Sequence, residues 1–171
     1  MIVDVLRYII IGILLLSIEN SAGKYLDVLG IRPDLLLIFT ISTSIRRGRN
    51  HGLLVGFFSG LAQDMTSLGF LGIYALSKSS LGFWLGRWVE ERDQLIRTWL
   101  WMVIIFFCVV VQGIWQGLFV IQSPDIGFME FLFKSILPIA VYTGVLGGVW
   151  ALIPMSTKRW KQVKTNSGRW L

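Results

Sequence analysis

The sequence predicts an all-α fold, a polytopic membrane bundle of about six transmembrane helices. Three observations carry this prediction: 54% of the 171 residues are hydrophobic, only 15% are charged, and long apolar runs recur along the chain. Soluble domains carry about a quarter charged residues, so this chain is too poor in charge for that class. The apolar runs are also too numerous for one soluble core, which leaves a multi-pass membrane protein.

The first predicted span covers residues 3–18, where Arg7 precedes the apolar stretch YIIIGILLLSI. A basic residue before an apolar run is also typical of a signal peptide. The sequence NSA near Ala22 is a poor cleavage site, however, and Asp4 is unusual in the basic start of a signal. We therefore expect this segment to be retained as the first membrane helix.

The second and third predicted spans, residues 35–45 and 51–65, are short for a bilayer, which needs about 20 residues. Pro33 and Asp34 open the second span, because proline suits a first helical turn and an acid favours the positive end of the helix dipole. The hydroxyls of residues 42–44 are expected to extend this helix by a turn, since they can bond back to its backbone. As an alternative, the two spans form a re-entrant hairpin, which leaves four full crossings.

The third span carries glycines at intervals of four. A helix turns about 100° per residue, so this spacing makes a slanted groove along one side. In lipid, small residues at such spacing let another helix approach closely. The positions are Gly48, Gly52, Gly56 and Gly60, followed four residues later by Asp64. We expect a helix to lie in or beside this groove, either from inside the bundle or from a partner protein.

The last three spans are predicted at residues 70–89, 98–121 and 130–153. The charged stretch EERDQLIR separates the fourth span from the fifth, and the loop QSPDIG precedes the sixth. Pro138 is expected to kink the sixth span. The chain is thus predicted to divide into a six-helix bundle over residues 1–155 and a basic cytoplasmic tail over residues 156–171.

The distribution of basic residues predicts that both termini are cytoplasmic. With six spans in this orientation, the outside segments hold only three basic residues, Lys24, Arg32 and Lys134. The inside segments hold twelve: Arg7, Arg46, Arg47, Arg49, Arg87, Arg92, Arg97, Lys158, Arg159, Lys161, Lys164 and Arg169. This bias agrees with the positive-inside rule. Tryptophans support the same orientation, because indole rings prefer the membrane interface. Those that fall near the proposed inner interface are Trp84, Trp88, Trp99, Trp101 and Trp150.

No catalytic constellation is visible in the sequence. The single histidine, His51, ends a basic loop and is more typical of an interfacial side chain than of a general base. Cys108 lies in an apolar run, where we expect a small buried hydrophobe rather than a reactive thiol. Neither metal-ligand spacing nor a phosphate-binding glycine motif occurs, so no enzyme, metal or cofactor is predicted. The basic tail with Trp160 and Trp170 fits an anionic lipid surface better than nucleic acid.

Polar side chains inside the spans predict contacts between helices. Lys78 lies near the middle of the fourth span, and charge at that depth usually faces a partner. The favoured partner acids are Asp64 and Glu19, with snorkelling of Lys78 toward the surface as an equal alternative. Asp64 is interpreted as a helix cap or a partner of Lys78 rather than a proton carrier. Gln112 and Gln116 are expected to bond neighbouring helices, with a ligand pocket as the alternative.

Three consecutive motifs carry a family resemblance: RPDLLLIFTIS, RRGRNHGLLVGFFSGLAQD and LGFLGIYALSKSSLGFWLGR, which cover roughly residues 31–87. This stretch resembles the MreD family, the small integral-membrane subunit of the bacterial rod-shape machinery. The family pattern has Pro-Asp-Leu opening a helix, Arg-Gly before a glycine-spaced helix ending in Gly-Leu-x-x-Asp, and then a glycine-punctuated helix. The matching positions are Pro33, Asp34, Leu35, Arg47, Gly48, Gly52, Gly56, Gly60, Leu61, Asp64, Gly69 and Gly72.

The resemblance implies a non-enzymatic scaffold of the cell-wall elongation complex in the bacterial inner membrane. It implies binding to the single-span protein MreC. Through MreC or directly, it implies contact with the MreB filament, the glycosyltransferase RodA and the elongation penicillin-binding transpeptidase. It also implies a bundle similar to the substrate-binding subunits of energy-coupling-factor transporters. A vitamin- or small-molecule-binding subunit of such a transporter is therefore the alternative function.

The residues expected to pack helices or bind a partner come from these motifs and from the charged position in the fourth span. They are Pro33, Asp34, Arg47, Gly48, Gly52, Gly56, Gly60, Asp64, Gly72 and Lys78. For the glycine groove, packing inside the bundle is at least as well supported as partner binding. Self-dimerisation through the groove is the least supported role.

Overall fold

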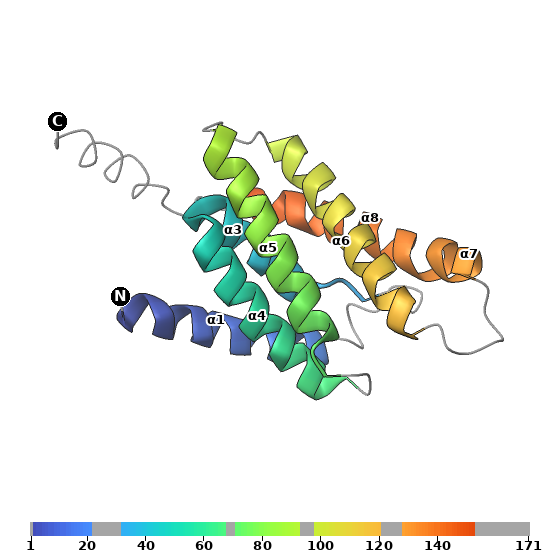
Figure 1. Ribbon diagram of the computed structural model, residues 1–171, viewed down its shortest axis with the longest axis horizontal. Coiled ribbons are helices and arrows are strands. Elements are labelled where there is room, and N and C mark those ends of the chain that lie inside the picture. The colour runs from blue at the N-terminus through green and yellow to red at the C-terminus, as the bar shows by residue number, and fades with distance from the viewer. Residues whose placement is uncertain (1, 22–31, 68–70, 93–97, 121–127, 153–171) are drawn as a thin grey trace.

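The computed structural model describes residues 2–21, 32–67, 71–92, 98–120 and 128–152, and every regular element in these ranges is a helix. The elements are α1 (Ile2–Ser21), α3 (Leu35–Arg47), α4 (Arg49–Thr66), α5 (Ile73–Arg92), α6 (Thr98–Val120), α7 (Phe128–Phe131), the π-helical η1 (Leu132–Ile136) and α8 (Leu137–Ala151). Figure 1 shows them gathered into a bundle in which α4 and α5 lie side by side. The all-α prediction is confirmed for this part of the chain.

Each of the six predicted spans corresponds to helix in the structure, with ends displaced by less than one turn. Two segments, Trp99–Leu118 and Met129–Ala151, are each long and apolar enough to cross a membrane. The two short spans are helices of 13 and 18 residues, α3 and α4. That all six cross the bilayer stays a prediction.

Helix α3 is the central helix of the bundle, in contact with α1, α4, α5, α6 and α8. Its side chains are buried without interruption from Leu36 to Ser44. A helix surrounded on all sides has no polar face, so its hydroxyls must find partners within the protein. Thr43 donates to the Phe39 carbonyl at 2.9 Å, which confirms the expected bond back to the helix for one of the three hydroxyls. Ser44 donates to the Gly82 carbonyl of α5 instead. Ser42 instead accepts the Trp150 indole N–H at 3.1 Å.

The glycine groove of α4 is filled by α5, which runs antiparallel to it. A Cβ added at Gly56 would lie 2.5 Å from the Lys78 carbonyl oxygen, and one at Gly60 would lie 2.5 Å from the Ala75 Cα. Real side chains do not tolerate such distances, so the backbones of α4 and α5 touch only because these positions are glycine. The glycine groove therefore forms one helix–helix interface inside the bundle, the one between α4 and α5. The central helix of the bundle is α3, which does not carry the glycines.

Glycine also occupies two positions beside this pair of helices where the backbone has a positive φ. Gly48 has a φ of 89° and is the single residue between α3 and α4, and Gly72 has a φ of 101° just before α5. Side chains other than glycine rarely adopt such left-handed angles. These two positions thus set where α4 and α5 start relative to α3.

The sixth predicted span is one continuous helical stretch made of α7, η1 and α8. The π-helical turn η1 lies directly before Pro138, where the sequence predicts a kink, and the Leu137 N–H donates to the Leu132 carbonyl. Proline lacks the N–H that a regular helix needs, and irregular helical turns commonly accommodate that loss. The backbone irregularity is therefore present at the expected position.

Several predictions concern parts of the chain outside the described residues. The boundary between the bundle and the basic tail, and the tail itself, fall within residues 153–171. Gly69 and the loops around Lys24 and Asp125 also lie outside. The division into a bundle and a tail stays a prediction.

Candidate functional site: a buried polar network and an adjoining cavity

Asp34 is the central residue of a polar network at the end of the bundle where α3 begins. Its carboxylate Oδ1 accepts the Leu37 N–H at 2.7 Å, so Asp34 caps the amino terminus of α3. The preceding residue is Pro33, and both residues are buried. An acid at this position satisfies an amide that the helix itself leaves unpaired. The helix-opening role predicted for Asp34 is what the structure shows.

Asp34 also joins three further helices, two through its carboxylate and one through its backbone N–H. Lys78 of α5 donates to Oδ1 of Asp34 at 2.5 Å, and Gln112 of α6 donates to Oδ2 at 2.7 Å. The Asp34 N–H donates to the Thr143 hydroxyl of α8 at 3.3 Å. Lys78 and Thr143 are fully buried, and Gln112 is 5% exposed. A charged pair this deep is costly unless hydrogen bonds compensate for the lost water, and Gln112 and Thr143 supply two such bonds to Asp34.

The predicted partner of Lys78 is wrong. The sequence favours Asp64 or Glu19, whereas the lysine is bound to Asp34. All three acids lie toward the same end of the bundle, so topology alone does not separate them. A role as a helix cap does not exclude Asp34, because a carboxylate has about four acceptor sites and can cap a helix and bind an ammonium together. The snorkelling alternative is also excluded, because Lys78 is fully buried.

Asp64 instead caps the neighbouring helix. Its two carboxylate oxygens accept the N–H groups of Tyr74 and Ala75, both at 3.0 Å, in the first turn of α5. Asp64 is 1% exposed, so this cap lies inside the protein. At the opposite end of the same pair, Glu90 of α5 accepts the Arg49 N–H of α4 at 2.9 Å. The antiparallel helices α4 and α5 therefore cap each other's amino termini with carboxylates.

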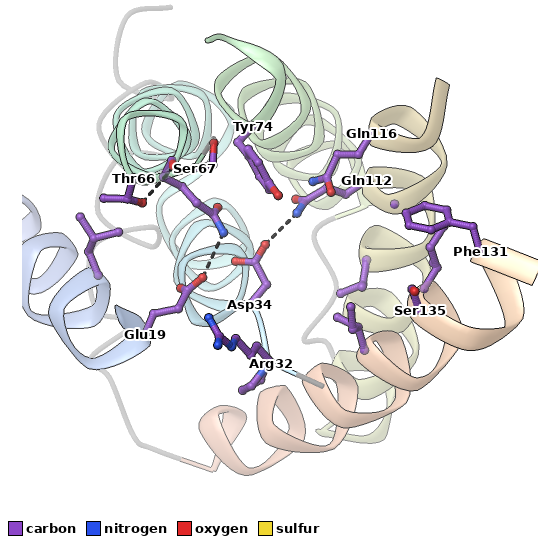
Figure 2. Close-up of a pocket in the computed structure, with 17 residues that line it drawn as sticks. Glu19, Arg32, Asp34, Thr66, Ser67, Tyr74, Gln112, Gln116, Phe131 and Ser135 are labelled. Atoms are coloured by element: carbon purple, nitrogen blue, oxygen red, sulfur yellow. Dashed lines mark hydrogen bonds between the residues drawn. The ribbon is translucent and has the colours of Figure 1, made fainter. Parts of the chain in front are cut away.

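A cavity of about 360 Å³ adjoins the Asp34 network. Figure 2 shows its polar residues pointing toward one another from several helices: Glu19 from α1, Tyr74 from α5, and Gln112 and Gln116 from α6. Glu19 accepts a hydrogen bond from the Gln63 amide at 3.0 Å. The other lining residues are Leu16, Arg32, Pro33, Asp34, Thr66, Ser67, Val109, Gly113, Phe131, Ser135, Ile136 and Ile139.

Of the two glutamines of α6, Gln112 meets both expectations, whereas Gln116 lines the cavity and its Nε2 has no hydrogen-bond partner in the protein. Gln112 bonds a neighbouring helix through Asp34, which confirms the interhelical role predicted for an amide in a membrane helix. Gln112 and Gln116 also line the cavity, the arrangement given as the alternative. Sequence reasoning did not find Tyr74, Gln63 or Ser135 as lining residues. Their positions show no pattern along the chain, because the cavity forms only when several helical segments converge.

The basic residues at the junction of α3 and α4 lie at the other end of the bundle. The Arg46 guanidinium lies 5.3 Å from the centre of the Trp101 ring, and that of Arg47 lies 5.6 Å from the centre of the Tyr8 ring. Both distances are typical of cation–π contacts. Arg47 and Asp34 therefore lie at opposite ends of α3. The contact that Gly52, Gly56 and Gly60 of α4 make with the backbone of α5, the glycine seam, runs between these two ends of the bundle.

The chain matches a known protein family along most of its length. The family described as rod shape-determining protein MreD matches residues 2–153. This covers far more than half of the chain. The chain belongs to the MreD family.

MreD proteins are non-enzymatic, polytopic membrane proteins that determine rod shape. The resemblance predicted from residues 31–87 is confirmed, and the match extends it across all six helical segments. No curated protein and no solved structure matches the chain. The predicted likeness to energy-coupling-factor subunits therefore has no support from the comparisons.

Within the residues that the structure describes in this MreD chain, no group of three His, Cys, Asp or Glu side chains could hold a metal ion. The network instead offers fixed hydrogen-bond donors and acceptors around one ion pair. Such an arrangement can hold helices in register, and the adjoining cavity can bind a polar molecule.

Proposed function

We propose that this MreD chain is a scaffold of the rod, or cell-wall elongation, complex in the bacterial inner membrane. It binds MreC and helps to couple MreB filaments to RodA and the elongation penicillin-binding transpeptidase. The observation that carries the proposal is the family match over residues 2–153. Large apolar side chains on the outer faces of the helices support it, because a partner has to meet a protein of this kind mainly inside the bilayer.

The proposed orientation places both termini in the cytoplasm. Arg46, Arg47 and Arg49 then lie at the cytoplasmic surface, where the positive-inside rule expects them and where anionic lipids attract basic side chains. The cavity and Asp34 lie toward the outer surface. Reporter fusions in the loop between α4 and α5 test this orientation. An exterior signal supports it, and a cytoplasmic signal contradicts it.

The partner helix is proposed to lie on the exposed face of α4 beside the glycine seam. The seam itself is occupied by α5, so it offers no free groove. The adjacent face presents Leu54, Phe57 and Phe58, of which Phe58 is 63% exposed. Large side chains on a regular helix surface can interdigitate with those of a single membrane helix.

Photocrosslinking in membranes tests this placement. A photoreactive residue at Phe58 is expected to crosslink to MreC, whereas one at Val145 of α8 is not. Val145 is a matched control because it is 53% exposed, also on a helix that faces outward. Crosslinks to MreC from Val145 alone would contradict the placement. Failure of MreC to co-purify with the intact protein would contradict the scaffold function itself.

The alternative function, a small-molecule-binding subunit of an energy-coupling-factor-type transporter, is favoured by one observation, the polar cavity. Its volume is within the range of about 300–1,000 Å³ found for small-molecule sites. Equilibrium binding of water-soluble vitamins to the purified protein tests this function. Saturable binding would support it, and no binding would leave the scaffold function as the account of the chain.

A further inference from the structure

The cavity contains polar atoms that the protein itself leaves without hydrogen-bond partners. Three of these buried atoms are acceptors, Oε2 of Glu19, Oε1 of Gln63 and Oε1 of Gln112, and one is a donor, Nε2 of Gln116. Buried polar atoms in native proteins nearly always have partners, so each exception calls for an explanation. Four exceptions around one cavity indicate that something else occupies it.

Gln112 shows that these atoms are fixed rather than free to turn away. Its side chain is 5% exposed, and its Nε2 is held by the carboxylate of Asp34 at 2.7 Å. The amide oxygen therefore has a set direction at the wall of the cavity. Glu19 and Gln63 are likewise joined to each other at 3.0 Å, which leaves one oxygen of each unpaired.

The charges around the cavity indicate the sign of the missing partner. The charge of Asp34 is balanced by Lys78 at 2.5 Å. Glu19 has the neutral Gln63 amide on one oxygen, and its other oxygen accepts no hydrogen bond, although Arg32 also lines the cavity. A buried carboxylate keeps its negative charge at the lowest cost when a cationic donor faces it, because burial of an uncompensated charge is costly. A cation with several N–H donors meets this need.

We propose that the cavity binds a primary ammonium group. Glu19 is its counter-charge, and the unpaired oxygens of Gln63 and Gln112 accept hydrogen bonds from the N–H and O–H donors of the bound molecule. A primary ammonium has three N–H donors, which suits a site where acceptors outnumber donors. An oxygen of the bound molecule, close to its ammonium group, accepts a hydrogen bond from Nε2 of Gln116. This chemistry occurs in two sources, a free amino alcohol such as ethanolamine and the headgroup of an ethanolamine phospholipid.

Water alone accounts less well for the cavity. Ordered waters can pair the amide atoms, as they do in many buried polar sites. They supply no counter-charge to the Glu19 carboxylate. The proposal goes beyond the scaffold function and does not depend on it, because none of the atoms involved lies on the outer face of α4.

Binding to the full-length protein tests the proposal without any variant. Ethanolamine and choline are titrated into detergent-purified protein by calorimetry. In parallel, the protein is reconstituted with phosphatidylethanolamine or phosphatidylcholine, and retained lipid is measured by native mass spectrometry. Choline keeps the charge but has no N–H donor, so at least tenfold weaker binding is expected for the choline form. Equal binding of both forms, or no binding of either, would overturn the proposal.

The two arms also separate the sources. Binding of free ethanolamine indicates a soluble amine, and preferential retention of phosphatidylethanolamine without binding of the free amine indicates a lipid headgroup. Either result supports the shared chemistry. If the cavity holds only water, neither arm distinguishes the ethanolamine form from the choline form, and the proposal is overturned.

Variants then assign the site. Glu19→Gln is expected to weaken binding of the ethanolamine form at least tenfold, and Gln63→Met several-fold. The matched control is Glu130→Gln, which removes an exposed acid that pairs with Lys134 outside the cavity. It is expected to bind like the wild type. Unchanged binding in folded Glu19→Gln would overturn the assignment, and the comparison of ethanolamine with choline remains decisive if that variant does not fold.

Discussion

The seam between α4 and α5 and the region around Asp34 join helices in opposite ways. Along the seam, glycines remove side chains so that the two backbones touch, and carboxylate caps lie at its ends. Around Asp34, four helices meet through polar side chains, and a cavity remains beside them. The seam is close-packed, whereas the Asp34 region is held by charge and hydrogen bonds.

The difference explains why the two regions respond to different changes. The seam fails when volume is added, because no atom there can move aside without moving a helix. The Asp34 region fails when one polar partner is removed, because the others remain buried without it. Substitutions in each region separate these two kinds of failure, and their expected effects decrease from the network to the single hydrogen bonds.

The largest effect is expected from Asp34→Ala. It leaves the Lys78 ammonium buried without its partner and removes the cap of α3. Loss of one member of a buried pair typically costs about 3–5 kcal/mol. The free energy of unfolding in mixed micelles, compared with that of the wild type, measures this cost. The control is Glu130→Gln, whose exposed ion pair contributes little. Wild-type stability of Asp34→Ala would refute the role assigned to the network.

Gly56→Leu is expected to be nearly as disruptive. Even a Cβ at this position would lie 2.5 Å from the Lys78 carbonyl oxygen, so the substitution has to push α4 away from α5. Overpacking typically costs about 1–3 kcal/mol, and more where the backbone is rigid. Gly12→Leu on α1 is the matched control, because nothing lies within 4 Å of a Cβ there. An unfolding temperature that is unchanged in Gly56→Leu but lowered in Gly12→Leu would contradict the close packing described for the seam.

The two caps of the seam are expected to differ in strength. Asp64→Asn replaces one of the two acceptor oxygens of a cap that is 1% exposed, and the buried N–H left unpaired costs about 1–3 kcal/mol. Glu90→Gln changes a cap with 26% side-chain exposure at the other end, where water replaces it at a cost of roughly a few tenths of a kcal/mol. Amide hydrogen exchange reports the opening of the first turn of α5 and of α4. Equal protection in both variants would show that burial does not set the strength of these caps.

The smallest effect is expected from Thr40→Val. The variant keeps the shape of the side chain but loses the 3.1 Å hydrogen bond between the Thr40 and Ser59 hydroxyls of α3 and α4. Hydrogen bonds between membrane helices average about 0.6 kcal/mol. A double-mutant cycle with Ser59→Ala isolates this bond. A coupling larger than the cost of Gly56→Leu would place the main contact of α4 on α3 rather than on α5.

The seam is predictable from the sequence, and the network is not. A spacing of four marks one side of a helix whatever surrounds it, so the glycines from Gly48 to Gly60 indicate close packing by their spacing alone. Hydropathy likewise places all six helical segments within a turn of their observed ends. These features are local, and each helix carries its own signal.

The network depends on the arrangement of helices that are distant in the chain. Asp34 and Lys78 are 44 residues apart, and Asp34 and Gln112 are 78 apart. No spacing rule relates such residues, and three acids at one end of the bundle are candidates for Lys78. The backbone amides of α5 take up Asp64 and the Gln63 amide binds Glu19, while Lys78 pairs with Asp34. The cavity is equally unpredictable, because it consists of space left between helices.

The coupling energy between Asp34 and Lys78 tests the network most directly. Stability is measured for Asp34→Asn, Lys78→Met and the double variant, alongside the matched cycle with Asp64→Asn. A direct pair predicts a coupling of about 2 kcal/mol or more between Asp34 and Lys78, and near additivity between Asp64 and Lys78. Additive effects of Asp34→Asn and Lys78→Met, together with strong coupling between Asp64 and Lys78, would contradict the network described here.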